Sequence, residues 1–473
     1  MNTQPFVEPL LETLRLLRHV GGRLDAMSLD LARDLGAVTR DAQAFAHLAQ
    51  ERAGTLYRAT PRAAKLVQVG TALLARHRWL RLAAAARGHE ALRDEDHRDL
   101  ARRTVQAAAQ LRGGIAKLGQ LASCRPDLVG PIWASELARL QDDVPPVPTE
   151  AIRACVEAEL ERPLAEVFAT FDEAPLAAAS LAQVHAATLL DGTPVAVKVQ
   201  VPAIEDVIEA DIAALRALAG ALGELPGVDL PMLADELARS LASELDYVAE
   251  ADALERFATS RSSVVVPRPI RAASTARVLT MTRLEGAKLV PWLDAASPDE
   301  RARLLGALVG EVAAQVLERG DVHADPHPGN FMVTAGGTLA MLDFGCTLEL
   351  APAERAAYAR LVLAIGAADQ AAAMRELAVL GFIADAPEQL VAITTALIGA
   401  MRPGAAVSEL DWESAFATQI AQAKQLSGLT IPRSFVLLGR VLATVAGLLA
   451  TYRPNIQLYP VIARSLVVAS AAG

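Results

Sequence analysis

The stretch His-Ala-Asp-Pro-His-Pro-Gly-Asn, residues 323–330, decides the fold, together with the Asp-Phe-Gly that begins at Asp343. Between them, residues 331–342 contain two apolar runs separated by Gly336-Gly337, a pattern typical of a tight β-hairpin. Such a hairpin returns the chain to its starting point, so it would place Asp343 beside Asn330. A carboxylate and an amide oxygen held close together suit Mg²⁺, which prefers oxygen ligands.

The spacing within residues 323–330 matches a kinase catalytic loop. Such a loop places a base Asp five residues before an Asn that binds metal, in a His-Arg-Asp frame. His323, Asp325 and Asn330 keep these positions. We therefore predict that Asp325 accepts or orients a hydroxyl proton, and that Asn330 and Asp343 hold a metal ion on the phosphates. Asp-Phe-Gly alone is a common tripeptide, but joined to this loop by a hairpin of fitting length it is a specific signal.

Residues 195–199, Val-Ala-Val-Lys-Val, form a β-run with one central lysine, as in the strand-lysine signature of kinases. Burying a lysine in an apolar strand is costly unless the charge is paired. An isolated Lys198 would be read as an edge-strand lysine that reaches solvent. In this order relative to Asp325 and Asp343, it is predicted to neutralise the α- and β-phosphates, with Glu250 as its helix partner.

A Gly-rich phosphate loop is missing before Lys198, and an Ala-rich stretch stands in its place. Alanine narrows the torsional range that glycine offers, so this loop should be stiffer and seat a nucleotide differently. The residues predicted to contact the nucleotide besides Lys198 are Ala177, Ala178, Ala179, Ser180 and Met281.

The composition favours a mostly helical protein with a small sheet. Of 473 residues, 52% are apolar and only 4% aromatic, with the apolar weight on Ala, Leu and Val. Strands are predicted at 181–190 and 195–200, joined by a turn at Asp191-Gly192. Further strands are predicted at 264–266 and 276–282. Helices are expected to about residue 140, from 149 to 161, from 204 to 257, and from 298 onward except at the hairpin around Gly336-Gly337.

Charge and cysteine content limit the possible partners. The net charge is −10, which argues against a general nucleic-acid binder, although residues 52–103 are locally basic. That segment could meet anionic lipid headgroups, with salt-sensitive binding to anionic liposomes, or be a solvated helix face. The three cysteines are too few for a disulfide framework. No signal peptide is apparent, and the apolar stretch 435–450, interrupted by Arg440, falls short of a membrane span of about 20 residues.

Further motifs resemble the UbiB/AarF family of atypical kinases. The family's Lys-x-Gly-Gln signature matches Lys117, Gly119 and Gln120, and its Glu-x-Asp signature matches Glu244 and Asp246. The resemblance covers about residues 110–350, and it places the αC-type glutamate on Glu250.

This resemblance implies that the Lys-x-Gly-Gln helix lies over the cleft where a kinase would hold a peptide, with Lys117 meeting Glu244 and Asp246. Protein phosphorylation is then not expected. Nor does a protein-kinase activation segment follow Asp343, because Cys346 leads quickly into a helix.

The resulting fold expectation is α+β, a protein-kinase-like two-lobed fold with an antiparallel sheet in the small lobe and a helical large lobe. Residues 1–105 would be an N-terminal helical extension, peripheral to a membrane if it binds lipid. Residues 106–285 would hold the Lys-x-Gly-Gln helix and the small lobe, and residues 286–473 the large lobe.

The functional expectation is a Mg²⁺- and ATP-binding atypical kinase or ATPase that supports isoprenoid-quinone or other lipid metabolism. One alternative is a non-catalytic ATP-dependent switch or lipid-binding scaffold. Another is a small-molecule kinase of the aminoglycoside type, which leaves Lys117, Gly119 and Gln120 unexplained. The expected partners are nucleotide and an anionic membrane lipid or quinone precursor, with no nucleic acid. The expected location is the cytoplasm, at the inner face of the membrane if peripheral.

Overall fold

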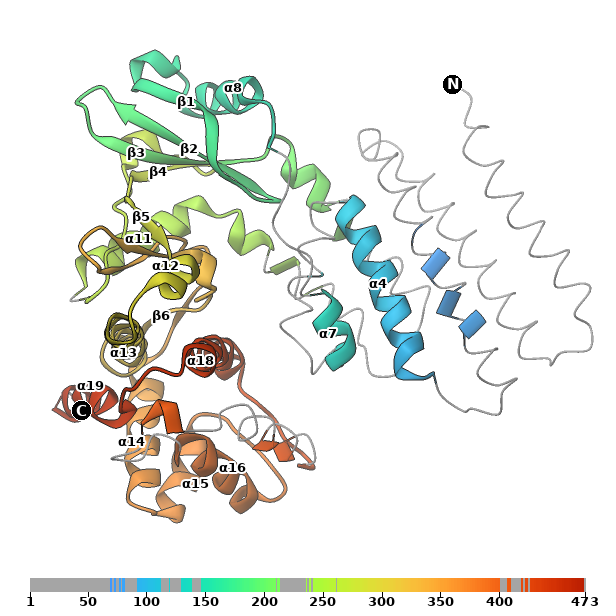
Figure 1. The fold of residues 1–473 in the computed structure, drawn as a ribbon, viewed down its shortest axis with the longest axis vertical. Helices are drawn as coiled ribbons and strands as arrows, with labels where there is room; N and C mark the ends of the chain where they lie inside the picture. Colours follow the sequence, from blue (N-terminus) through green and yellow to red (C-terminus); the bar gives the residue numbers. More distant parts are fainter. Residues whose placement is uncertain are drawn as a thin grey trace, which may run out of the picture. The chain divides into compact units, whose positions relative to one another are not determined.

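The computed structural model describes residues 69, 72–73, 76–77, 79–80, 92–111, 119, 129–137, 146–209, 211–212, 235, 238–239, 241–260, 262–399, 406–409, 418–419, 422–423 and 426–471 (Figure 1). The chain divides into two compact units. The first comprises residues 1–146, 178–181 and 201–242, and the second comprises residues 147–177, 182–200 and 243–473.

A four-stranded sheet forms the small lobe of the second unit. Its strands are β1 (Phe168–Ala178), β2 (Ala182–Leu189), β3 (Pro194–Gln200) and β4 (Val278–Thr282), in the order β1-β2-β3-β4. Both β2–β3 and β3–β4 are antiparallel. The helices of this lobe are α8 (Thr149–Leu160) and α11 (Tyr247–Thr259), with short 3₁₀ turns η1 (Leu164–Glu166) and η2 (Arg271–Ala273).

The predicted hairpin between β2 and β3 is confirmed. Gly192 has a φ of +87°, which glycine adopts without the steric cost that a side chain would bring. The Asp191 carboxylate accepts a hydrogen bond from the Thr193 N–H at 2.9 Å, a contact typical of turn aspartates. This turn fixes the register in which Lys198 lies opposite Val184.

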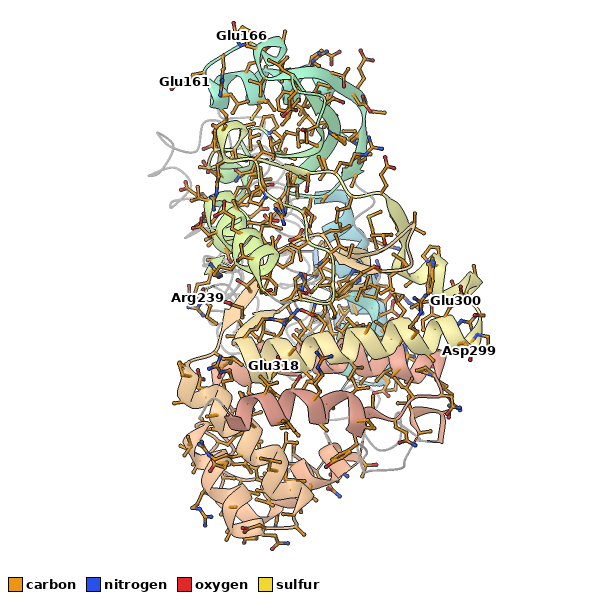
Figure 2. The ribbon with its side chains drawn as sticks, turned by 90° about the vertical axis from the view of Figure 1, so that its left-hand side faces the viewer. Glu161, Glu166, Arg239, Asp299, Glu300 and Glu318 are labelled. Carbon is orange, nitrogen blue, oxygen red and sulfur yellow. The ribbon has the colours of Figure 1, made fainter. Side chains whose placement is uncertain are left out.

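The large lobe is helical. It contains α12 (Leu289–Ala295), α13 (Pro298–Ala314), the π-turn η3 (Gln315–Arg319), α14 (Pro352–Gly366), α15 (Gln370–Val379), α16 (Pro387–Gly399), η5 (Val407–Glu409), α18 (Arg433–Tyr452) and α19 (Leu458–Ala471). Ser297 and Glu300 form a capping box that starts α13. Figure 2 shows this helix as one long rod from the labelled Asp299 and Glu300 to Glu318 in the π-turn. Both α18 and α19 pack against α13.

Two small sheets contain the strands on either side of the loop at residues 324–330. β5 (Gly286–Lys288), β7 (Phe331–Thr334) and β8 (Leu339–Met341) form one, and β6 (Asp321–His323) pairs with β9 (Thr347–Glu349) in the other. The 3₁₀ turn η4 (Pro328–Asn330) leads into β7. β7 and β8 form the predicted hairpin, with Phe331 opposite Met341. The Leu342 N–H then donates to the carbonyl of Asn330 at 2.9 Å, so the hairpin returns the chain to its start as predicted.

Three secondary-structure predictions need correction. Residues 264–266 are not a strand, because only Val265 forms an isolated bridge, with Ala340. Strand β1 was missed, and Ala177 and Ala178 belong to its end rather than to a loop. The predicted helices from 204 to 257 lie partly outside the described residues, and the described part includes a break at Leu245-Asp246 before α11.

The helix α18 is longer than the sequence predicted. Within the described part of the chain, Ser434–Tyr452 is long and apolar enough to cross a membrane by length and composition alone. Five of its residues are buried in the large hydrophobic core: Leu438, Val441, Val445, Leu448 and Leu449. One face of α18 therefore packs on the core, while 28% of the apolar window is buried in all.

The described part of the first unit includes α4 (Asp94–Leu111) and α7 (Pro131–Leu137), which pack together. Ion pairs join Arg76 and Arg103 to Asp99, and Arg102 to Glu136. Part of the positive charge noted in residues 52–103 is thus matched by carboxylates.

Candidate functional site

Strand β3 orients Lys198 through the two-residue period of a strand. Successive side chains of a strand point to opposite faces of the sheet. The valines at 195, 197 and 199 are fully buried in a cluster with Ile152 and Val156 of α8. Lys198 therefore points to the other face, where Glu250 of α11 lies.

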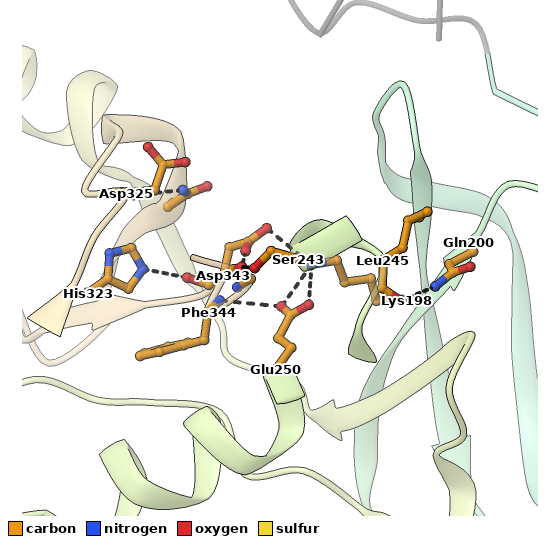
Figure 3. Close-up of polar contacts among 11 residues, drawn as sticks. Lys198, Gln200, Ser243, Leu245, Glu250, His323, Asp325, Asp343 and Phe344 are labelled. Atoms are coloured by element: carbon orange, nitrogen blue, oxygen red, sulfur yellow. Dashed lines mark hydrogen bonds and ion pairs between the residues drawn. The ribbon is translucent and has the colours of Figure 1, made fainter. Parts of the chain in front are cut away.

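Lys198 bonds to two carboxylates at once (Figure 3). Its Nζ donates to both Glu250 carboxylate oxygens at 2.8 Å and to Asp343 Oδ2 at 3.2 Å. The Glu250 side chain is 1% exposed and that of Lys198 is 13% exposed, whereas Asp343 is 44% exposed. The lysine also lies 5.2 Å from the ring centre of Tyr247, a cation–π distance.

These contacts set the charges of the site. Burial lowers the pKa of Lys198, but the charges of Asp343 and Glu250 outweigh it and hold that pKa well above its usual value. Burial raises the pKa of Asp343, yet Lys198 and the Gly345 N–H bring it down to about 2. Burial raises the pKa of Glu250, and the bonds from Lys198 counteract that effect. At neutral pH the amine is protonated and Asp343 is ionised.

Helix α11 begins at a position that presents Glu250 to the lysine. Asp246 caps the helix, since its side chain accepts a hydrogen bond from the Ala249 N–H at 2.9 Å. The chain before the cap is fixed to the sheet, because the buried Gln200 side chain donates to the Leu245 carbonyl at 2.6 Å. Asp246 thus has a structural role in addition to the one predicted for it with Lys117, which lies outside the described residues.

Asp325 and Asn330 occupy the loop between β6 and β7. The Asn330 side-chain amide donates to the backbone carbonyl of Asp325 at 3.0 Å, so the two residues are held in one turn. This bond uses the amide nitrogen of Asn330 and leaves its oxygen as the atom that can bind a cation. In Figure 3, Asp343 is drawn between Asp325 on one side and Lys198 on the other.

The segment Asp343-Phe344-Gly345 is anchored from both sides. Phe344 is 1% exposed and packs against Phe257 of α11 and against His323. Its N–H donates to Glu250 at 3.3 Å, and the His323 Nε2 donates to the Asp343 carbonyl. With Phe344 packed inward, the Asp343 carboxylate is directed toward Lys198.

The residues present fit a magnesium–nucleotide complex. Asp343 is an ionised, partly exposed carboxylate that comes directly after the β7–β8 hairpin, and Asn330 comes directly before it. Oxygen donors of this kind suit Mg²⁺, which usually keeps waters and binds phosphate oxygens as well. The protonated amine of Lys198 supplies the positive charge that phosphates need.

The remaining predicted site residues are distributed as follows. Ala179 and Ser180 lie in the connection between β1 and β2. Met281 is a buried residue of β4 opposite Ala196. Gly119 is helical and buried, while Gln120 lies outside the described residues. Glu244 precedes α11.

Sequence reasoning missed a buried polar group behind the loop. Glu311, 2% exposed, accepts hydrogen bonds from Gln315, Arg319 and Ser263. Gln315 in turn accepts one from the His323 N–H at 2.9 Å. A π-turn, a feature frequent at functional sites, begins at Gln315 and could not be read from the residue pattern.

The sequence matches the model of a known protein family. A model of the ABC1 atypical kinase-like domain matches residues 139–377, about half of the chain. The chain belongs to the ABC1 atypical kinase-like family. The matched range contains Lys198, Glu250, Asp325, Asn330 and Asp343.

Curated ABC1 relatives agree with this assignment and with the resemblance to AarF proteins. An uncharacterized chloroplastic aarF domain-containing protein kinase of Arabidopsis thaliana is 34% identical over 77% of this chain and 54% of its own length. ACTIVITY OF BC1 COMPLEX KINASE 3 of the same plant, also chloroplastic, is 35% identical over 74% of this chain and 51% of its own. The chain spans about half the length of these relatives.

A solved structure has a fold similar to that of this chain. The complex of Rv3197 with erythromycin from Mycobacterium tuberculosis matches 74% of this chain and 92% of its own, with a TM-score of 0.52 and 22% identity. The α+β, kinase-like fold predicted from the sequence is confirmed.

Proposed function

We propose that this ABC1 protein binds ATP with Mg²⁺ at the site around Lys198 and acts as an atypical kinase or ATPase. The observation that carries the proposal is the simultaneous contact of one protonated amine with Glu250 and Asp343. Kinases that transfer phosphoryl groups need this lysine–glutamate pair and the metal-binding aspartate in place together. Family membership supports a kinase-type enzyme in general.

Each residue has a distinct task in this proposal. Lys198 binds the α- and β-phosphates, and Glu250 holds the amine in position. Asn330 and Asp343 would hold Mg²⁺, which when bound neutralises charge on the β- and γ-phosphates. Asp325, 41% exposed, orients the hydroxyl or water that attacks the γ-phosphate and accepts its proton.

The acceptor is proposed to be a small molecule or water rather than a protein. The chain after Gly345 enters β9 almost at once, and β9 pairs with β6 over Asp321 to His323. α14 starts at Pro352, so residues 346–351 leave no room for the long activation segment of a protein kinase. We propose isoprenoid-quinone precursors or other lipids as the metabolic context, in keeping with the resemblance to UbiB/AarF proteins.

A peripheral membrane location at the cytoplasmic face is part of the same proposal. The exposed Trp79 lies in the locally basic part of the chain, near Arg76. Since Arg76, Arg102 and Arg103 are already paired with carboxylates, the attraction to anionic lipid should be moderate. Equal recovery on neutral and anionic liposomes at low salt would argue against this location.

The function is tested by a phosphate-release assay with ATP, with and without Mg²⁺, anionic liposomes and a phenolic quinone-precursor mimic. We expect Mg²⁺-dependent release that Lys198→Ala abolishes, and a changed rate in Ala179→Gly if the Ala-rich loop restrains turnover. ATP binding without release under every condition would instead favour a nucleotide-dependent switch. Absence of ATP binding would reject both.

A further inference from the structure

Arg440 is a cation in the middle of an otherwise apolar helix. Its neighbours Leu438 and Val441 on α18 are buried in the core, and the Arg440 side chain is only 23% exposed. Burying a guanidinium is costly unless its N–H groups are used. The groups that bond to the Arg440 guanidinium therefore show what compensates for its burial on α18.

Four contacts of the guanidinium reach the proposed catalytic loop and the segment after Asp343. Arg440 Nε and Nη2 donate to the Ala324 carbonyl at 2.9 and 2.5 Å. Nη2 also donates to the Cys346 Sγ at 3.1 Å and lies 3.9 Å from Asp325 Oδ1. The Ala324 N–H also donates to the Cys346 carbonyl at 3.0 Å. Residues 324 and 346 are therefore linked both by this backbone hydrogen bond and by the Arg440 guanidinium.

The bond from Arg440 to Ala324 matters because Ala324 directly precedes the proposed base Asp325. In the His-Arg-Asp frame of kinase loops an arginine precedes the base aspartate, and this chain has Ala324 there. A cation is nevertheless present at the loop, delivered by a helix 116 residues farther along the chain. The fork of the guanidinium binds the carbonyl of the residue just before Asp325, which restricts where the Asp325 carboxylate can point.

We propose that Arg440 is the positioning residue of this loop, acting on Asp325 and on the segment after Asp343 in place of the missing loop arginine. The inference rests on the proposed function for its kinetic consequence. Its structural consequence, a rigid link between residues 324 and 346, is independent of turnover.

Positioning and nucleotide binding can be separated by kinetics. Arg440 bonds to Ala324 and Cys346, whereas Lys198, Glu250 and Asp343 bond to one another, so Arg440→Met should leave the dissociation constant for ATP within about twofold. Misplacing a reacting group by about 1 Å can cost about 100-fold in rate, so we expect kcat to fall between about 10- and 100-fold. Arg440→Lys keeps the positive charge but loses the guanidinium fork, so its kcat should lie between those of wild type and Arg440→Met.

The matched control is Arg464→Met, since Arg464 is exposed on α19. Added guanidinium ion should restore part of the rate of Arg440→Ala and leave the control unchanged. A normal kcat in Arg440→Met, or a loss explained by weaker ATP binding alone, would overturn the proposal.

Amide hydrogen exchange of the full chain without nucleotide tests the link directly. We expect Arg440→Met to speed exchange in peptides covering residues 321–325 and 346–349, and Arg464→Met to leave them unchanged. Unchanged exchange in Arg440→Met would overturn the proposal. If wild type releases no phosphate, the enzymatic function fails, while the exchange result still decides whether Arg440 holds the loop.

Discussion

Lys198 Nζ lies 2.8 Å from both carboxylate oxygens of Glu250, a residue 52 positions later in the chain. The glutamate is almost fully buried, and it also accepts a hydrogen bond from the Phe344 N–H. The Glu250 carboxylate on α11 is therefore hydrogen-bonded both to β3, through Lys198, and to the Asp-Phe-Gly segment, through the Phe344 N–H. Any change at Glu250 should be felt both in stability and in the geometry of the nucleotide site.

We predict that Glu250→Gln lowers the free energy of unfolding by about 2 kcal/mol, less than the full cost of breaking a buried ion pair, because Lys198 keeps Asp343 as a charged partner. Denaturant unfolding monitored by circular dichroism measures the change. Glu255→Gln on the same helix is the control. Glu255 is half-exposed and pairs with Arg271 at the surface, where water screens the ion pair, so Glu255→Gln should change the free energy of unfolding far less than Glu250→Gln. Equal effects of the two substitutions would contradict a special role for Glu250.

His323 should make stability fall in mild acid. Burial lowers the pKa of His323 below 6.5, although the Asp343 carbonyl favours the protonated ring. Its Nε2 donates to that carbonyl, and its Nδ1 finds no hydrogen-bond partner among the described residues. The unfolded chain then binds the proton more readily, so this contribution is complete above about pH 6.5 and is lost as the pH falls through the folded-state pKa.

The measurement is the unfolding free energy of wild type and His323→Gln at pH 5.5 and 7.5. Wild type should lose more stability between these values than the variant does. Parallel pH profiles for the two proteins would show that His323 is not the titrating group.

Gly286 is predicted to be required for the pairing of β5 with β7. A Cβ at this position would lie 2.3 Å from the Val333 carbonyl oxygen and 2.8 Å from its carbon, both backbone atoms. Gly286→Ala should therefore cost about 2 kcal/mol, in the range of overpacked substitutions. Gly306→Ala in α13, where a Cβ meets nothing within 4 Å, should instead stabilise the protein by about 0.5 to 1 kcal/mol. Thermal unfolding of both variants checks the opposite signs.

The sequence predicted the parts of the site that depend on short-range spacing. The β7–β8 hairpin and the β2–β3 turn follow from turn residues flanked by apolar runs, so both were readable. Strand β1 was missed because it is an edge strand with mostly exposed side chains and a proline at 175, which gives no apolar alternation. The apolar run 264–266 was misread because only Val265 pairs with β8, donating to the Leu339 carbonyl and accepting from the Met341 N–H, so the pairing is an isolated bridge and not a strand.

Contacts between distant segments could not be predicted in the same way. The bond from Arg440 to Ala324 joins residues whose spacing carries no periodic signal, and only the cost of an arginine in an apolar helix hinted at a partner. The network from Glu311 through Gln315 to His323 depends on a π-turn that appears only once α13 is packed.

In the proposed function, Asp343 and Asn330 hold a metal-bound triphosphate beside Lys198. Since the pKa of Asp343 is about 2, its carboxylate is already ionised between pH 6 and 8. Its contribution to the affinity for Mg²⁺ and ATP should therefore be constant in this range. The most direct measurement is calorimetric titration of ATP with Mg²⁺ and with a chelator, for wild type, Asp343→Asn and the exposed control Asp299→Asn. We predict binding at least about tenfold tighter with Mg²⁺ in wild type and in the control, about 1.4 kcal/mol, and no such gain in Asp343→Asn. A wild-type affinity that is the same with and without the metal would contradict the account.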